Sequence, residues 1–136
     1  MSPTQPEVYQ LDHLVLTVKD IAKTIAFYET VLGMHGEVFA TADGTNRWAL
    51  KFGHGKINLH QLGSEFQPNA RQATIGSADL CFLTQTPLPV WQQHLENTAT
   101  PVEEGPVPRT GATGPLVSLY VRDPDGNLIE IAVLAD

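Results

Sequence analysis

The chain has 136 residues, of which 42% are hydrophobic and 17% are charged, so it has enough apolar material for a packed core and is not typical of a disordered protein. Its formal net charge of −7 argues against a nucleic-acid partner, because phosphate binding requires clustered Lys and Arg. The N-terminus lacks the features of a signal peptide, and no apolar run reaches the roughly 18–20 residues of a membrane span. Cys81 is the single cysteine, which excludes an intrachain disulfide. These features predict a cytoplasmic protein with no membrane partner.

The first half of the chain reads as a strand, a helix and three further strands. Residues 1–9 are expected to form a flexible tail. Residues 10–18 alternate between apolar and polar side chains, as a half-buried strand does. Asp20 is placed to cap a helix over residues 21–32, which Gly33 would close. The three further strands are expected near residues 35–41, 46–52 and 56–62.

The second half repeats this order after a linker at residues 63–76, which is rich in Gly, Ser, Pro and Asn. Residues 77–84 read as a strand. Thr86 is expected to cap a helix that runs to about Asn97, with Pro87 in its first turn. Three strands are expected near residues 101–107, 116–122 and 127–133, the last two joined by the turn Asp123-Pro124-Asp125-Gly126.

This duplication predicts an α+β fold of tandem βαβββ units, over residues 10–62 and 77–136, and it places four potential metal ligands at two repeated positions. His13 and Asp79 each lie seven residues before the helix cap of their unit. His60 and Glu130 lie five and four residues after the turn glycine before the last strand of their unit. Two imidazoles and two carboxylates suit a divalent ion such as Zn²⁺, Ni²⁺, Co²⁺, Mn²⁺ or Fe²⁺.

Strand alternation places these four side chains opposite the apolar face that the helices would cover. A purely structural explanation exists for each of them. A single histidine in a strand is more often a hydrogen-bonded core residue than a ligand, and Asp79 alone is most simply a polar residue at a strand end. Glu130 lies within an apolar strand and needs a partner, and a salt bridge with Arg47, Arg109 or Arg122 is the alternative to a metal ion. Because potential ligands recur at repeated positions in both halves, we favour metal binding over these structural explanations.

Four segments carry a resemblance to a known family: LDHLVLTVKD (11–20), IAFYETVLGM (25–34), GKINLHQ (55–61) and SLYVRDPDGNLIEI (118–131). The chain resembles the glyoxalase/bleomycin-resistance/dioxygenase superfamily, also called vicinal oxygen chelate proteins. The last segment, with its DPDGN turn, is the most specific of the four.

The resemblance implies a curved cup of mixed sheet in which each unit supplies half of eight strands. It also implies metal ligands from the first and last strand of each unit, and a homodimer that builds each site from two subunits. On that pattern His13 and His60 of one chain would meet Asp79 and Glu130 of the other. The order His, His, Asp, Glu departs from the order His, Glu, His, Glu of bacterial glyoxalase I. Extradiol dioxygenases and fosfomycin-resistance enzymes carry a histidine where this chain has Asp79.

The resemblance implies first a metal-dependent lyase or isomerase, like lactoylglutathione lyase, that acts through an enediolate on a small substrate with vicinal oxygens, for example a glutathione adduct. Glu130 is the expected catalytic base, with Asp79 as the alternative. Ser118 and Tyr120 are expected to hydrogen-bond the substrate, and two arginines to hold an anionic group of it, namely Arg47 and Arg109. The alternatives are an Fe²⁺ or Mn²⁺ extradiol-type dioxygenase and a non-catalytic protein that sequesters a drug or metabolite.

Overall fold

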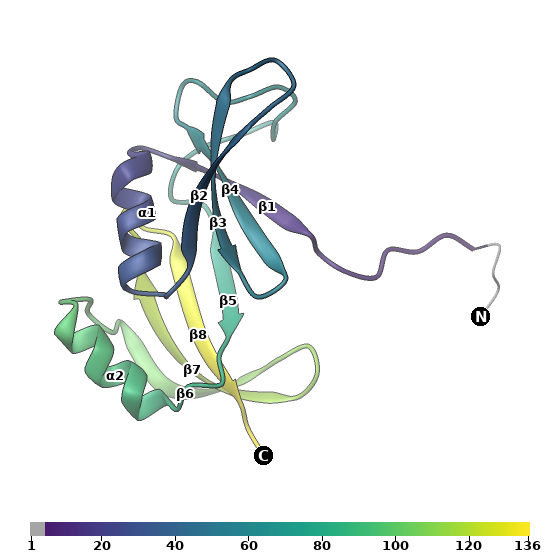
Figure 1. The fold of residues 1–136 in the computed structure, drawn as a ribbon. Helices are drawn as coiled ribbons and strands as arrows, with labels where there is room; N and C mark the ends of the chain where they lie inside the picture. Colours follow the sequence, from purple (N-terminus) through teal and green to yellow (C-terminus); the bar gives the residue numbers. More distant parts are fainter. Residues whose placement is uncertain (1–4) are drawn as a thin grey trace.

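The structure, a computed structural model, describes residues 5–136 as two successive βαβββ modules (Figure 1). The elements are β1 (His13–Val18), α1 (Ile21–Thr30), β2 (His35–Ala40), β3 (Asn46–Phe52), β4 (Gly55–Gln61), β5 (Asp79–Leu83), α2 (Leu88–Asn97), β6 (Glu104–Thr110), β7 (Pro115–Arg122) and β8 (Leu128–Leu134). The predicted α+β class and the duplicated order of elements are therefore confirmed.

The strands form two four-stranded sheets, one from each module. Sheet A has the order β1-β4-β3-β2 and sheet B the order β5-β8-β7-β6. The first and last strands of each module pair in parallel, and the other neighbours pair antiparallel. Both sheets are thus mixed and have the same topology, as a repeated unit requires.

The two helices begin differently. The Asp20 carboxylate accepts a hydrogen bond of 3.0 Å from the backbone N–H of Lys23 and caps α1 as predicted. The predicted cap of α2 is wrong: the cap is Pro87, and no side chain caps this helix. The backbone N–H of Thr86 instead donates to the Thr84 hydroxyl at 3.1 Å, which folds this segment into a local turn before the helix starts.

One apolar core lies between the two modules. It contains residues from the helix-facing sides of both sheets and from both helices, and the two helices lie on the same side of the sheets in Figure 1. The Phe52 and Phe82 rings, one from each module, meet edge to face with centroids 5.2 Å apart. The Tyr28 hydroxyl of α1 donates to the Asp123 carboxylate after β7 at 2.6 Å. The apolar core is therefore built from residues of both modules.

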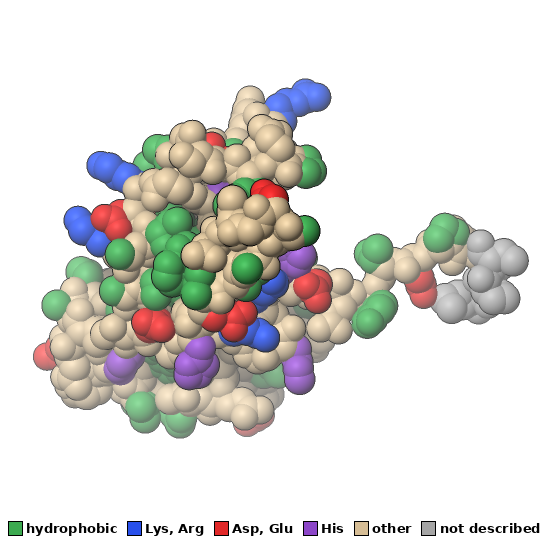
Figure 2. Space-filling view, turned by 45° about the horizontal axis from the view of Figure 1, so that its top comes forward, with side chains coloured by type: hydrophobic (Ala, Val, Ile, Leu, Met, Phe, Trp, Pro, Cys, Tyr) green, Lys and Arg blue, Asp and Glu red, His purple; other side chains and the backbone are tan. Residues whose placement is uncertain are grey.

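The segment before β1 does not pack against this core. Residues 5–12 are extended and exposed, and they leave the body on the side away from the helices (Figures 1 and 2). Of the predicted tail, residues 1–4 lie outside the described part of the chain. Neither helix of that part is long and apolar enough to span a membrane.

Candidate functional site

We call the side of each sheet that points away from the helices its front face. The apolar residues of each strand alternate with front-face residues, so the core contacts fix which side chains point forward. All the site residues predicted from the sequence lie on the two front faces. Sheet A carries His13, Arg47 and His60, and sheet B carries Asp79, Arg109, Ser118, Tyr120 and Glu130.

The strand register corrects the predicted equivalence of His60 and Glu130. In sheet B, Asp79 pairs with Leu128, two residues before Glu130. In sheet A, His13 pairs with Lys56, four residues before His60. The residue at the position of Glu130 is therefore Asn58, and His60 lies one full strand repeat beyond it.

This register separates the two histidines along the sheet. Four residues of strand span about 13 Å, and strand side chains stand roughly perpendicular to the sheet, so the rings of His13 and His60 do not converge. Within one protomer, residues 5–136 bring no three His, Cys, Asp or Glu side chains close enough to hold a metal ion.

His13 is oriented by a neighbouring carboxylate. Its Nδ1 lies 2.8 Å from the Asp12 carboxylate, and the side chain is partly exposed at the start of β1. Because a carboxylate only accepts, Nδ1 is the donor of this hydrogen bond, and Nε2 is the ring nitrogen left for a metal ion. A carboxylate bound to the second ring nitrogen is the usual support of a metal-binding histidine.

Glu130 lies between two hydroxyl-bearing strand neighbours on β7. The buried Ser118 hydroxyl donates to its Oε2 at 2.6 Å, and Tyr120 pairs with Glu130 across the β7–β8 ladder. The carboxylate is half-buried. One of its oxygens is thus held by Ser118, and the Cys81 thiol and Tyr120 hydroxyl also interact with the carboxylate.

Two of the three arginines considered as partners of Glu130 bind other carboxylates. Arg109 binds Glu104 at 2.8 Å, and Arg122 binds Glu103 through two hydrogen bonds of 2.9 and 3.0 Å. Among residues 5–136, no ion pair includes Glu130 or Asp79. Arg122 lies near enough to Asp79 to interact with its charge, but neither carboxylate forms an ion pair with a basic side chain of the described chain.

Arg109 also contacts a predicted substrate-binding residue. Its Nε donates to the Tyr120 hydroxyl at 2.8 Å, which raises the pKa of Arg109, and the hydrogen bond to Glu104 adds to this effect. The pKa of Tyr120 is raised, mainly by desolvation. Arg109 and Tyr120 thus form a hydrogen-bonded pair beside Glu130, and the Tyr120 hydroxyl also interacts with the Glu130 carboxylate, which contributes to the raised pKa of Tyr120.

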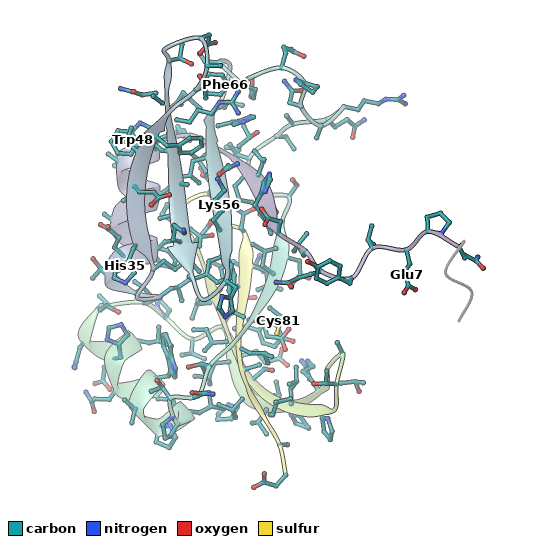
Figure 3. All side chains as sticks on the ribbon, turned by 45° about the vertical axis from the view of Figure 1, so that its right-hand side comes forward. Glu7, His35, Trp48, Lys56, Phe66 and Cys81 are labelled. Atoms are coloured by element: carbon teal, nitrogen blue, oxygen red, sulfur yellow. The ribbon has the colours of Figure 1, made fainter. Side chains whose placement is uncertain are left out.

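His60 belongs to a second cluster, on the front of sheet A. Phe66, from the predicted linker, stacks on the Arg47 guanidinium at 3.9 Å from the ring centroid and meets the His60 ring edge to face at 5.5 Å (Phe66 is labelled in Figure 3). His60 and Asn58 are only 4% and 8% exposed. Three buried polar atoms of this cluster have no hydrogen-bond partner in the described chain: Arg47 Nε, Asn58 Oδ1 and His60 Nδ1.

The linker thus does more than connect the modules, because it covers part of the front of sheet A. A cavity of about 180 Å³ lies beneath it. Its lining includes Thr17 and His60 from the sheet and Asn69, Gln72 and Thr74 from the linker. This small cavity was not predicted from the sequence. The aromatic Phe66 is the one signal in the linker that could have indicated a contact with sheet A.

The burial of His60 predicts a dependence of stability on pH. Burial lowers the pKa of His60, and the nearby Arg47 charge lowers it further. The unfolded chain therefore binds more protons than the folded chain below the ordinary histidine pKa of about 6.5. We expect the free energy of unfolding to fall as the pH drops from 7.5 to 5, and to fall less in His60→Gln. Urea unfolding at several pH values measures this difference.

His54→Gln is the matched control, because His54 lies exposed in the β3–β4 turn. The expectation fails if His60→Gln and the wild type lose the same stability between pH 7.5 and pH 5.

Cys81 lies on the front of sheet B, paired with Glu130 across the β5–β8 ladder. Burial, together with the charge of Glu130, raises the pKa of its thiol to about 11. The thiol is therefore protonated near neutral pH, and a nucleophilic role is unfavourable.

The fold and the front-face residues define a class of proteins. Its members have two successive βαβββ modules, with carboxylate and histidine side chains on the front faces of the sheets. Residues 10–131 match the Glyoxalase/Bleomycin resistance protein/Dioxygenase superfamily, and the chain belongs to this superfamily. The predicted resemblance is confirmed.

Two relatives and one solved structure extend this finding. Virulence protein STM3117 of Salmonella typhimurium is 54% identical over 90% of this chain and 83% of its own length. Glyoxalase domain-containing protein RDO1 of Mycosarcoma maydis is 52% identical over 97% of this chain and 72% of its own length. A structure from the mobile metagenome of V. Pseudocholerae superposes with a TM-score of 0.91 at 52% identity, covering 97% of this chain and 99% of that one.

Proposed function

We propose that this protein is a metal-dependent lyase or isomerase of the glyoxalase type, which acts as a homodimer on a small substrate with vicinal oxygens. The observation that carries the proposal is Glu130, a half-buried carboxylate with one fixed oxygen and no cationic partner among the described residues. A carboxylate in this setting is suited to share a cation and to accept a proton. Many members of the superfamily are enzymes, which agrees with such a role.

The separation of the candidate ligands supports the homodimer. His13 lies on sheet A, whereas Asp79 and Glu130 lie on sheet B, and one protomer does not bring them together. If the front of sheet A faces the front of a partner's sheet B, the two faces form a cup with His13 opposite the partner's carboxylates. This arrangement is the one that the family resemblance implies.

The residues fit a divalent ion. His13 offers Nε2 because Asp12 holds Nδ1, and Asp79 and Glu130 offer carboxylate oxygens that form no ion pair within residues 5–136. A bound divalent ion would supply Lewis-acid polarisation of the substrate oxygens. We assign the core of the ligand set to His13, Asp79 and Glu130.

His60 and Asn58 are the two candidates for the fourth ligand. Asn58 occupies the place that corresponds to Glu130, and its Oδ1 has no hydrogen-bond partner. His60, the ligand predicted from the sequence, is four residues from the level of His13. We therefore assign the fourth position to Asn58, and we assign His60 to the substrate pocket.

Metal titration of variants tests this ligand set. We expect Asp12→Ala to weaken metal binding about 10- to 100-fold, as loss of a supporting hydrogen bond does. His13→Ala, which removes a ligand, should weaken it more than Asp12→Ala, and His60→Ala should weaken it less. A competition titration with a chromophoric chelator measures each affinity, with His54→Ala as the control. Equal losses in His60→Ala and His13→Ala would return His60 to the ligand set.

The remaining front-face residues would bind and orient the substrate. Glu130 would accept the proton of a carbon next to a carbonyl group, with Ser118 holding Oε2 so that the other oxygen faces the substrate. Arg109 and Tyr120 would contact a polar group on the sheet B side. Arg47 would hold an anionic group on the sheet A side, where its Nε lacks a partner.

Activity measurements separate this function from its alternatives. Purified protein is analysed for metal and then assayed with methylglyoxal, with and without glutathione. Isomerisation that depends on added metal supports the proposal. Catechol cleavage with Fe²⁺ would instead indicate a dioxygenase, and tight ligand binding without turnover at any metal would indicate a sequestering protein.

A further inference from the structure

The extended segment 5–12, which we call the arm, exposes large apolar side chains. Val8 and Tyr9 are 96% and 95% exposed, and Leu11 is also exposed. The arm leaves the body on the side opposite the helices, and hydrophobic side chains stand clear of the surface along it (Figures 1 and 2). Large apolar groups gathered on an exposed segment mark a contact with another molecule.

A complementary hollow lies on the front of sheet B. It has a volume of about 380 Å³ and is bordered by residues 110–113, at the end of β6 and in the loop that follows it. Two exposed leucines, Leu83 and Leu134, line it together with the buried Leu116. Cys81 and Glu130 also line it. The hollow is therefore apolar along one side and ends at the proposed catalytic carboxylate.

The position of the arm in the chain connects it to this hollow in a second copy. The arm runs directly into His13, the first residue of β1. In the homodimer of the proposed function, His13 lies opposite the partner's Glu130, which itself lines the hollow. Leu11 and Tyr9 lie two and four residues before His13, or about 7 and 13 Å along an extended chain. The arm thus starts at the edge of the partner's hollow and is long enough to cross it.

We propose that arm residues 8–11 dock in the sheet B hollow of a second copy of this chain and form a wall of that copy's site. The apolar side chains of the arm would pack on Leu83, Leu116 and Leu134 of the other protomer. The docked arm would cover one side of Glu130 and restrict the access of water to it. This inference rests on the homodimer of the proposed function and adds a contribution that the sheet faces alone do not make.

Disulfide trapping with the native Cys81 tests the docking directly. A longer, tagged chain carrying Leu11→Cys and Cys81→Ser is mixed with the unmodified chain, allowed to exchange subunits and oxidised. Neither chain then has two thiols, so a disulfide between Cys81 and the introduced thiol can only join different chains. We expect a one-to-one adduct on a non-reducing gel that reductant removes. Val90→Cys with Cys81→Ser is the matched control, because Val90 is exposed on α2, on the helix side.

Sedimentation velocity over a dilution series supplies the second readout. We expect the triple substitution Val8→Ser/Tyr9→Ser/Leu11→Ser to raise the dimer dissociation constant about 100-fold or more, because each buried apolar side chain contributes roughly a tenfold factor or more. Val90→Ser should leave it unchanged.

The outcomes distinguish the arm from the shared site. The adduct with Leu11→Cys and the weakened dimer together support the docking. A stable wild-type dimer that forms no adduct, or that the triple substitution does not weaken, overturns the docking and leaves the shared metal site standing. A wild-type chain that is monomeric at all concentrations overturns both.

Discussion

Glu130→Gln is expected to lower the turnover number about 10²- to 10⁴-fold, the range that a general base usually contributes. The amide keeps the shape of the side chain and can still accept the hydrogen bond from Ser118. It cannot take a proton near neutral pH, and it removes one negative charge from the site. Steady-state kinetics at saturating metal measure the loss, and thermal unfolding shows whether the fold is retained.

Glu103→Gln is the control for this substitution. Glu103 is also a front-side carboxylate of the second module, but it pairs with Arg122 near the β7–β8 turn. Its loss should change turnover by less than the loss of Glu130, since it lies outside the proposed ligand set. Unchanged turnover in Glu130→Gln would remove Glu130 from the role of the base.

Asp123→Ala is expected to lower the free energy of unfolding by about 3–5 kcal/mol, because it leaves several buried donors without an acceptor. The Asp123 carboxylate is buried and accepts four hydrogen bonds. They come from the Tyr28 hydroxyl, the backbone N–H groups of Asp125 and Asn127, and the Asn127 side-chain amide. Urea unfolding followed by circular dichroism measures the loss.

Tyr28→Phe isolates the one bond of this network that joins the modules. It removes the donor of the 2.6 Å hydrogen bond and keeps the buried ring. The expected cost is about 1–2 kcal/mol, smaller than that of Asp123→Ala. If both variants are as stable as the wild type, the turn after β7 does not hold the modules together.

The fold was predictable because two signals repeat in the sequence. Apolar alternation locates the strands, and helical spacing with the cap at Asp20 locates α1. Element boundaries were less accurate. β6 begins at Glu104 rather than near residue 101, because Pro101 and Val102 do not join the β6–β7 ladder. Local patterns identify a strand more reliably than they identify its ends.

The sequence also predicted that the candidate site residues lie on the front faces. It did not predict which residues of the two modules occupy equivalent strand positions. Counting from the turn glycines made His60 and Glu130 equivalent. The β3–β4 connection is a two-residue turn between Phe52 and Gly55, whereas the β7–β8 connection after Arg122 has five residues. Distance from a turn glycine therefore measures turn length as well as strand position.

The contacts of the linker with sheet A were out of reach for a different reason. Phe66 contacts Arg47 and His60 only because the chain folds back after β4. No periodic pattern encodes such a return, and the linker is polar enough to be read as a solvated connection. The same limit applies to Asp12, whose role becomes visible only when its carboxylate is seen on the His13 ring.

Because the two modules share one core, substitutions in this protein fall into two kinds. A change on the helix side of either sheet must satisfy neighbours from both halves at once, because neither half closes its own interior. A change on the front faces meets fewer neighbours, such as Phe66 of the linker on sheet A. New chemistry can thus arise by replacing a few forward-pointing side chains while the interior stays the same, which explains how one scaffold can serve lyases, oxygenases and drug-binding proteins.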